Sequence, residues 1–502
     1  MTGLARRTVA LPDEAATARL GEDLALAIAP GMALLLSGDL GAGKTSLARS
    51  LLRALHDDAG LEVPSPTFTL LQPYEGARVP VAHVDLYRIA DPAEVEELDL
   101  PGWLDRGALL VEWPERGGLA PGAGRVGNAL GFGGTETGRV ATVEAEDTVL
   151  ARLDRIRAGR AFLEGAGWGA AGRRFLQGDA SSRRFERVAL GGGTAILMDS
   201  PRRPDGPPVM DGLPYSRIAM LAEDVRPFVA VGAHLTRVGL SAPDLLAHDL
   251  DAGFLLAEDL GDEKIAVAGA PVPERYLVAA DVLAHLHRTA APDELPLPDG
   301  GRHRLAAFDQ RVFRAELSLY PDWYLAARGT VLDPDRRAAF EAVWRDLLAI
   351  ALAGERHLAL RDFHSPNLLW LPEREGVRRI GLIDHQDALI GPTAYDVASL
   401  AQDARVTVPE ALERAILARY VAGRTGEAGF DETAFRTAYA ILAAQRAVRI
   451  MGTFTRLDRR DGKPAYLAHI PRLEAYLART LAHQALAPLR DWFAAGTPAN
   501  FP

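Results

Sequence analysis

The chain has 502 residues, of which 48% are hydrophobic and 25% charged, a composition that is typical of a soluble globular protein and excludes wholesale disorder. Its length predicts at least two domains. The formal net charge is −11, and residues 1–156 hold 14 Lys and Arg against 23 Asp and Glu, so this first part is not expected to bind nucleic acid tightly by itself.

Missing features narrow the class of protein further. The sequence contains no cysteine, which excludes disulfides and thiolate metal sites. No apolar run approaches the ~20 residues that cross a bilayer, and Pro12, Asp13 and Glu14 interrupt any signal-peptide core. We therefore expect a cytoplasmic protein that does not associate with a membrane.

Residues 33–55 predict a strand, a phosphate-binding loop and a helix. The sequence GDLGAGKT fits G-x-x-x-x-G-K-[ST], the P-loop. In a P-loop, backbone N–H groups and the helix N-terminus hold the β-phosphate of ATP, the lysine reaches the β- and γ-oxygens, and the hydroxyl binds Mg²⁺. The residues that we expect to bind the nucleotide are Gly38, Gly41, Gly43, Lys44 and Thr45.

Two carboxylates follow at the ends of predicted strands. Val63–Leu70 contains two prolines, which forbid a helix, and predicts a switch-like loop with hydroxyls toward the nucleotide. Val79–Leu86 predicts a strand that carries Asp85, and Ala108–Val111 predicts a strand that delivers Glu112. Because a P-loop enzyme needs one carboxylate for Mg²⁺ and one group to orient water, we expect Asp85 and Glu112 to take these roles.

GDLGAGKTS, SPTFTL, HVDLYR and LLVEWPE together resemble the TsaE family, the bacterial ATPases of tRNA threonylcarbamoyladenosine synthesis, over about residues 8–150. The resemblance implies that Lys44 and Thr45 bind phosphate and Mg²⁺ and that Asp85 supports the metal. It further implies that Glu112 is catalytic and that Thr67 senses the γ-phosphate. The implied partners are TsaB- and TsaD-like proteins, which would make most of the tRNA contacts.

The middle of the chain predicts the border between two domains. Gly127–Gly138 is glycine-rich and predicts a hairpin that closes the first domain. Leu150–Glu164 has a helical pattern, and we place the border there, which gives domains 1–155 and 156–502. Beyond the border, Phe175–Val188 predicts a strand, a phosphate-covering turn and a second strand, followed by a third strand at residues 195–198.

Residues 253–387 add an adenine hinge and a catalytic loop. Gly253–Gly261 predicts a strand that runs into a hinge, where the backbone beside Glu258 would contact adenine. Asp362 and Asn367 have the D-x-x-x-x-N spacing of a kinase loop, and a second apolar strand ends at Asp384. In that arrangement the first Asp accepts the proton of the substrate hydroxyl, while Asn and the second Asp hold Mg²⁺.

GDASSRRF, GFLLAEDLGD, LRDFHSPNLLWL and IDHQDAL resemble the aminoglycoside phosphotransferase family, and within it the kinases of N-acetylmuramate and N-acetylglucosamine, over about residues 155–490. The implied fold class is an α/β P-loop NTPase domain followed by a bilobal α+β domain like that of protein kinases. The resemblance makes Asp362 the base and Asn367 and Asp384 the Mg²⁺ ligands, with an amino sugar as acceptor. It also implies that Asp396 braces the loop, with weaker candidates near the acceptor at Asp387, Asp403 and Arg405.

Two departures from the family pattern keep other functions open. Leu360 stands where a histidine is usual, and Met198 stands where most kinases have a phosphate-binding lysine, a role that we assign to Arg183 or Arg184. Only three of the 56 basic residues are lysine. The alternatives are a kinase of an aminoglycoside, choline or homoserine, or a second domain that binds ATP without catalysis.

Overall fold

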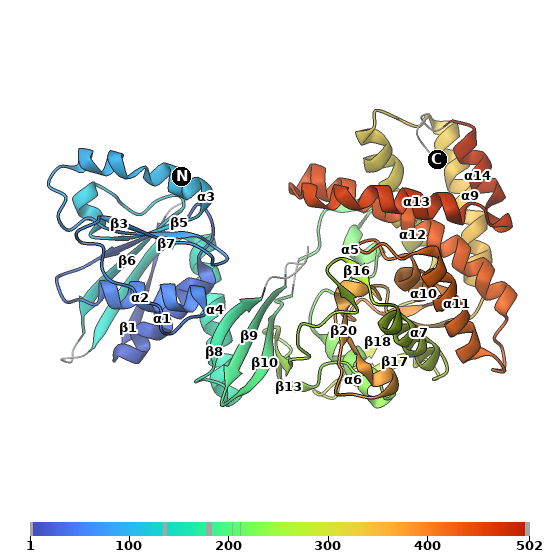
Figure 1. Cartoon of the computed structure of the whole chain (residues 1–502), viewed down its shortest axis with the longest axis horizontal. Helices are drawn as coiled ribbons and strands as arrows, with labels where there is room; N and C mark the ends of the chain where they lie inside the picture. The colour runs from blue at the N-terminus through green and yellow to red at the C-terminus, as the bar shows by residue number, and fades with distance from the viewer. Residues whose placement is uncertain (1–3, 134–137, 177–182, 203, 211, 497–502) are drawn as a thin grey trace. The chain divides into compact units, whose positions relative to one another are not determined.

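A computed structural model of the chain describes residues 4–133, 138–176, 183–202, 204–210 and 212–496 (Figure 1). It divides into two compact units, residues 1–199 and 200–502. The domain border that the sequence predicts between residues 155 and 156 lies inside helix α4, Asp147–Gly165, and remains a prediction.

The first unit is built on a seven-stranded sheet with the order β1-β7-β6-β2-β5-β4-β3. Strand β2 pairs in parallel with β5 and β6, and β4 pairs in parallel with β5, whereas the outer pairs β1–β7, β6–β7 and β3–β4 are antiparallel. The predicted hairpin that closes this sheet is confirmed as β6 and β7, and its residues 134–137 lie outside the described residues. The strands are β1 Leu4–Leu11, β2 Ala33–Ser37, β3 Leu71–Tyr74, β4 Val81–Asp85, β5 Ala108–Glu112, β6 Arg125–Phe132 and β7 Arg139–Glu146.

Both faces of this sheet are buried, which explains why its central strands are apolar throughout. Along β2, Leu34 and Leu36 belong to one hydrophobic core with residues of α1 and α2, while Leu35 belongs to a second core that includes Trp103 of α3. Helix α1 begins at Glu14, where the side chain of Asp13 caps its N-terminus. The helices are α1 Glu14–Ala27, α2 Lys44–His56, the 3₁₀ helix η1 Pro92–Leu98, α3 Leu100–Arg106 and the 3₁₀ helix η2 Pro114–Gly117.

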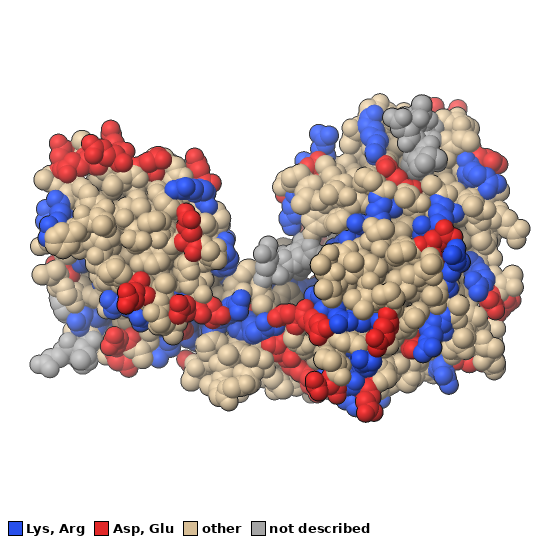
Figure 2. Space-filling model, in the orientation of Figure 1, with Lys and Arg blue, Asp and Glu red and all other residues tan. Residues whose placement is uncertain are grey.

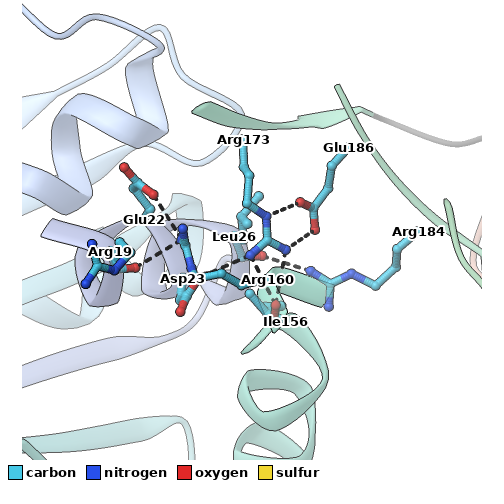
Figure 3. A network of polar contacts seen from close by, with 9 residues as sticks. All are labelled: Arg19, Glu22, Asp23, Leu26, Ile156, Arg160, Arg173, Arg184 and Glu186. Carbon is cyan, nitrogen blue, oxygen red and sulfur yellow. Dashed lines mark hydrogen bonds and ion pairs between the residues drawn. The ribbon is translucent and has the colours of Figure 1, made fainter. Parts of the chain in front are cut away.

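The first unit also contains helix α4 and three antiparallel strands, β8 Gly172–Leu176, β9 Arg184–Leu190 and β10 Gly193–Asp199. They confirm the three strands predicted after the border, and the predicted turn at residues 177–182 lies outside the described residues. Figure 3 shows a buried network of charged side chains that joins these strands and α4 to α1. We call this network the joint, and it consists of Asp23, Arg160, Arg173 and Glu186.

Within the joint, Asp23 on α1 accepts hydrogen bonds from Arg160 on α4 at 2.7 Å and from Arg173 on β8 at 3.3 Å. Arg173 in turn donates to both carboxylate oxygens of Glu186 on β9, at 2.7 and 3.1 Å. All four side chains are buried. Each charge therefore has a partner of opposite sign from another element.

The C-terminal end of α1 is capped by arginines from three other segments. Arg78 donates to the carbonyls of residues 25 and 28, Arg184 to that of residue 26 and Arg152 to that of residue 27. The last turn of α1 holds no basic residue of its own. Since the last carbonyls of a helix lack partners and carry partial negative charge, these cations satisfy them and hold α4 and β9 against α1.

The second unit is mainly helical around one hydrophobic core, with small two-stranded sheets. Its longest helix, α12, contributes residues to that core along most of its length. The helices are α5 Tyr215–Ile218, α6 Arg226–Arg237, α7 Pro273–His287, α8 Gln310–Leu317, the π-helix η3 Tyr320–Leu325, α9 Pro334–Ala353, η4 Ser365–Asn367, η5 Gly376–Arg379, α10 Ala394–Ala401, α11 Glu410–Arg424, α12 Glu432–Asp461, η6 Pro464–His469, α13 Ile470–Thr480, η7 Gln484–Leu486 and α14 Ala487–Ala494.

Most strands of the second unit are short and belong to two-stranded sheets. Strand β20 leads out of the D-x-x-x-x-N segment and pairs with β21, which leads to Asp384. No described helix is both long enough and apolar enough to span a bilayer. The strands are β11 Pro208–Met210, β12 Leu213–Pro214, β13 Leu245–Asp249, β14 Phe254–Glu258, β15 Ala266–Val267, β16 Ala270–Pro271, β17 Glu294–Pro296, β18 Arg302–Arg304, β19 Arg356–Ala359, β20 Leu368–Trp370, β21 Ile380–Leu382 and β22 Leu389–Pro392.

Candidate functional site

The loop between β2 and α2 has the backbone that a P-loop requires. Gly38, Gly41 and Gly43 all have positive φ angles, of 129°, 79° and 105°. A Cβ atom on Gly38 would lie 2.2 Å from the carbonyl oxygen of Leu130, so only glycine fits there. At Gly41 and Gly43 such an atom would meet nothing within 4 Å, which leaves open space beside the loop.

Lys44 lies across this loop with its ammonium group over the backbone. Its Nζ donates to the carbonyls of Gly38 and Asp39 at 2.7 and 3.0 Å, and lies 3.5 Å from the ring centroid of Trp113. Burial lowers the pKa of Lys44, and Glu112 acts in the opposite direction. Among the described residues, no carboxylate forms an ion pair with this buried ammonium group, which therefore suits the β- and γ-phosphates of ATP.

Glu112 connects the P-loop helix to the neighbouring strand. Its Oε2 accepts a hydrogen bond from the hydroxyl of Thr45, and its Oε1 lies 2.9 Å from Nε2 of His83, which is fully buried on β4. Strands β4 and β5 place Asp85 directly opposite Glu112. The sheet therefore presents the two predicted carboxylates side by side at the ends of parallel strands.

Asp85 holds the predicted switch-like loop. Its Oδ2 accepts hydrogen bonds from the hydroxyls of Ser65 and Thr67, the latter at 2.9 Å, and its Oδ1 accepts one from the backbone N–H of Tyr87 at 2.9 Å. Thr67, which the sequence assigned to the γ-phosphate, thus lies beside the carboxylate assigned to the metal. These oxygens are the ligand type that Mg²⁺ prefers.

In the second unit, Asp362 lies on a short loop between β19 and η4. The residues Arg361 and Asp384 have φ angles of 68° and 58°, a left-handed conformation that is unusual for residues other than glycine and concentrates at functional sites. The side-chain amide of Asn367 donates to the carbonyl of Asp362 at 3.1 Å and to Oδ2 of Asp384 at 3.4 Å. Three predicted kinase residues, Asp362, Asn367 and Asp384, therefore form one cluster.

The charges around Asp362 favour its ionised form. Burial acts to raise the pKa of Asp362, but His364, Arg449 and the other nearby cations outweigh it, so its pKa is lowered from the usual value. The Nε2 atom of His364 lies 3.8 Å from Oδ1 of Asp362. A carboxylate that stays ionised can accept a proton from a hydroxyl.

Buried carboxylates hold the backbone around this cluster. Asp396 accepts hydrogen bonds from the N–H groups of Leu360 and Arg361 at 2.6 and 2.9 Å, which is the bracing role expected of it. Asp403 accepts from the N–H groups of Ser365 and Arg405, both at 2.8 Å. The predicted acceptor contacts of Asp387, Asp403 and Arg405 remain predictions.

The residues present at both sites fit ATP with Mg²⁺. The P-loop offers the glycine cradle and Lys44, while Thr45 and Asp85, and separately Asn367 and Asp384, offer oxygen ligands. Among the described residues no group of three or more His, Cys, Asp or Glu is placed to hold a metal. Nucleotide-bound Mg²⁺ needs only one or two carboxylates, because phosphates and water complete its coordination.

Two protein families match the chain in separate parts. Residues 11–127 match the family "Threonylcarbamoyl adenosine biosynthesis protein TsaE", and residues 172–436 match the "Phosphotransferase enzyme family". The chain belongs to both families. It is a bifunctional enzyme with a TsaE ATPase domain and a phosphotransferase domain, each with the fold of its family.

Named relatives match each domain. A protein from Caulobacter vibrioides named "N-acetylmuramate/N-acetylglucosamine kinase" is 38% identical over 352 residues, which are 68% of this chain and 96% of that protein. A protein of the same name from Pseudomonas aeruginosa is 34% identical over 61% of this chain and 82% of its own length. The "tRNA threonylcarbamoyladenosine biosynthesis protein TsaE" of Synechocystis sp. is 44% identical over 115 residues, 21% of this chain and 69% of its own.

Three residues that the sequence assigns to nucleotide binding in the phosphotransferase domain make contacts with other parts of the protein. The guanidinium group of Arg184 donates to the carbonyl of Leu26 on α1 at 3.1 Å, and its phosphate role remains a prediction. Arg183 takes part in other contacts and its phosphate role remains a prediction. Glu258 ends β14 as predicted, its carboxylate pairs with Arg374 at 2.5 Å and its backbone N–H donates to the carbonyl of Asp244 at 2.8 Å, so the hinge contact with adenine remains a prediction.

Sequence reasoning missed several residues that support these sites. His83 and Ser65 lie within the motifs HVDLYR and SPTFTL, but only the folded sheet shows that they contact Glu112 and Asp85. Glu316 is fully buried and pairs with Arg361, the neighbour of Asp362, although it lies far from both in sequence. No sequence pattern around Glu316 predicts that it pairs with Arg361.

Proposed function

We propose that the TsaE domain hydrolyses ATP in support of threonylcarbamoyladenosine synthesis on tRNA, together with TsaB- and TsaD-like partner proteins. The observation that carries this proposal is the contact of Glu112 with Thr45 beside Asp85, which provides a metal site and a carboxylate for water next to a P-loop. The names of the TsaE relatives support the assignment to tRNA modification.

The surface of this domain supports indirect binding of tRNA. Acidic side chains gather over η1 and the turn before it (Figure 2), where Asp91, Glu94, Glu96 and Glu97 are exposed and would repel nucleic-acid phosphates. Beside the P-loop, Leu40 and Phe68 are 76% and 82% exposed. Exposed apolar side chains next to an active site are typical of a surface that a partner protein covers.

We propose that the phosphotransferase domain transfers the γ-phosphate of ATP to the anomeric hydroxyl of N-acetylmuramate or N-acetylglucosamine, a step of cell-wall recycling. The observation that carries this proposal is the cluster of Asp362, Asn367 and Asp384. The names of two relatives, one of them matched over almost its full length, supply the acceptor.

In this reaction the sugar oxygen forms a bond to the γ-phosphorus, the bond from that phosphorus to the bridging oxygen of ADP breaks, and Asp362 accepts the hydroxyl proton. An anomeric hydroxyl is more acidic than an ordinary alcohol, so a carboxylate of low pKa suffices when the proton moves late. Asn367 and Asp384 would hold Mg²⁺, which neutralises charge on the phosphates. Asp396 keeps the loop of Asp362 in place through its backbone hydrogen bonds.

One experiment tests the acceptor directly. The full chain is incubated with ATP, Mg²⁺ and either sugar, and the product is identified by phosphorus NMR as an anomeric sugar phosphate. Choline, homoserine and an aminoglycoside serve as competing acceptors. Phosphorylation of one of these instead of the sugars would overturn the proposal, and binding of ATP with transfer to no acceptor would favour a domain that binds ATP without catalysis.

A further inference from the structure

Lys264 occupies a position against the catalytic loop that neither family assignment explains. It lies between β14 and β15, and its Nζ donates to the carbonyl of Pro366 at 2.7 Å. Lys44 and Lys463 are the other lysines of the chain, so Lys264 and Lys463 are the lysines of the second unit. Pro366 directly precedes Asn367, the residue assigned to Mg²⁺.

The backbone around Lys264 is fixed to the strand that follows Asn367. The N–H of Ile265 donates to the carbonyl of Leu368 at 3.2 Å, and the N–H of Trp370 donates to the carbonyl of Glu263 at 2.7 Å. Lys264 itself forms an antiparallel bridge with Leu369. The segment therefore holds the base of the lysine side chain in a set place beside the cluster of Asp362, Asn367 and Asp384.

The charge of Lys264 is not neutralised by a direct ion pair. Within the residues that the structure describes, no carboxylate lies within salt-bridge distance of its ammonium group, and Pro366 provides its hydrogen-bond acceptor. Burial lowers the pKa of Lys264, and the charge of Asp262 acts in the other direction. A partly buried ammonium group that meets only a backbone carbonyl retains the capacity to bind an anion, since an ammonium group has three donors.

The phosphotransferase domain needs a cation that its third strand does not supply. Met198 stands in β10 at the place of the usual lysine, and Arg184 of the neighbouring strand donates a hydrogen bond to the carbonyl of Leu26 on α1. Because Lys264 rests on Pro366, which directly precedes Asn367, a nucleotide whose Mg²⁺ were held by Asn367 and Asp384 would have its phosphates close to this segment. We propose that Lys264 is a nucleotide-binding residue that donates to a phosphate oxygen of ATP in the phosphotransferase domain, an inference that rests on the proposed use of ATP there.

A covalent probe tests this on the unaltered protein. An acyl-phosphate derivative of ATP transfers its acyl group to lysine amines that lie beside bound nucleotide phosphates, and the chain offers Lys44, Lys264 and Lys463. We expect peptide mass spectrometry to find acylated Lys44 and Lys264, both protected by excess ATP, and no ATP-protected label on Lys463. Label on Lys44 without label on Lys264, at a saturating probe concentration, would overturn the proposal.

This result does not depend on sugar turnover, so it separates the inference from the proposed acceptor. Failure of sugar phosphorylation with ATP-protected label on Lys264 would refute the acceptor and leave the inference standing. Turnover of the sugar without label on Lys264 would support the acceptor and refute the inference about Lys264.

Substitutions supply the second test. Lys264→Met should raise the KM for ATP in sugar phosphorylation about tenfold or more, the usual effect of losing a hydrogen bond between charged groups, while Lys264→Arg restores most of the affinity. Lys463→Met is the matched control on an exposed residue, and it should change the KM for ATP less than twofold. Competition by ADP should weaken in Lys264→Met whereas competition by adenosine stays the same. A fall in kcat at constant KM, or equal weakening of ADP and adenosine, would instead assign Lys264 to support of the loop.

Discussion

The hydroxyl of Thr45 donates a hydrogen bond of 2.9 Å to Glu112, and thereby joins the first turn of the P-loop helix to the end of the neighbouring parallel strand. The other oxygen of Glu112 meets the ring of His83. Because the carboxylate is held on both sides, its position relative to the P-loop is fixed before a nucleotide binds. Preorganised groups of this kind lower the barrier of the chemical step more than they strengthen binding.

Glu112→Gln should therefore reduce ATP hydrolysis far more than ATP affinity. The glutamine keeps an acceptor for Thr45 but loses the charge that acts on metal and water, and we expect a rate loss of about 100-fold or more. The measurement is ATP turnover by the full chain with Asp362→Asn present, which silences the second site, and with TsaB- and TsaD-like partners added. Asp85→Asn should behave in the same way, and a loss of affinity as large as the loss of rate would contradict these roles.

Lys44→Ala should abolish ATP hydrolysis by the TsaE domain while leaving sugar phosphorylation within about twofold of the parent. Lys44 provides the ammonium group that lies on the P-loop backbone, and a single such electrostatic contact typically contributes about 100-fold in rate. Both activities are measured on one preparation of the full chain. Undiminished hydrolysis would show that the P-loop is not the hydrolytic site.

Asp362→Asn should abolish sugar phosphorylation, because an amide cannot accept the hydroxyl proton, and should leave ATP hydrolysis by the TsaE domain unchanged. Binding of ATP to the second domain should survive, since Asn367 and Asp384 are untouched. Anomeric phosphate is assayed by phosphorus NMR and nucleotide binding by calorimetry on a Lys44→Ala background. Retention of sugar phosphorylation in the variant would exclude Asp362 as the base.

The rate of sugar phosphorylation should fall as the pH drops through about 6. Burial raises the pKa of Asp396 to about 6, and protonation below that value removes the charge that holds the N–H groups of Leu360 and Arg361. Asp362, whose pKa is lowered, stays ionised over the same interval. The check is kcat against pH, in which Asp396→Asn should lower kcat and remove the step near pH 6. A profile that stays flat down to the ordinary range of carboxylates, about pH 4, would rule out this effect of Asp396.

Arg173→Met should destabilise the first unit by about 3–5 kcal/mol, because it leaves the buried carboxylates of Asp23 and Glu186 without that partner. Arg6→Gln, which breaks an exposed pair with Glu144, is the control and should cost less than about 1 kcal/mol. Hydrogen exchange of amides in α1 and β8 measures the stability of the first unit in both variants, because these amides belong to that unit alone. Equal exchange in the two variants would mean that the joint does not stabilise the unit.

Sequence patterns predicted the parts of both sites that lie close together along the chain. The P-loop glycines, Lys44 and Thr45 lie in one short segment, and Asp362 and Asn367 are five residues apart. The spacing of these residues along the chain was therefore enough to predict both sites. Asp85 and Glu112 could be assigned because parallel strands end at one edge of a sheet, and the register confirms that they face each other.

The contacts that patterns could not predict join segments far apart in sequence. His83 on Glu112, Glu316 on Arg361 and Arg184 on Leu26 depend on the folded arrangement, and the residue types alone favour no particular partner. Strand β1 was missed for a related reason, since LARRTVAL alternates weakly and becomes a strand by pairing with β7. The start of α1 at Glu14 is fixed by a hydrogen bond from the backbone of Ala16 to Asp13, which hydrophobic periodicity does not detect.

The contacts of the joint make it difficult to separate the two enzyme domains into two proteins. Strands β8 to β10 lie in the part of the chain that matches the phosphotransferase family, yet they belong to the compact unit of the ATPase. A gene divided between these parts would leave Asp23 without Arg173 and the carbonyl of Leu26 on α1 without Arg184 in one product, whereas Arg173 would keep Glu186 as its partner in the other. A later separation would have to replace buried residues on both sides at once.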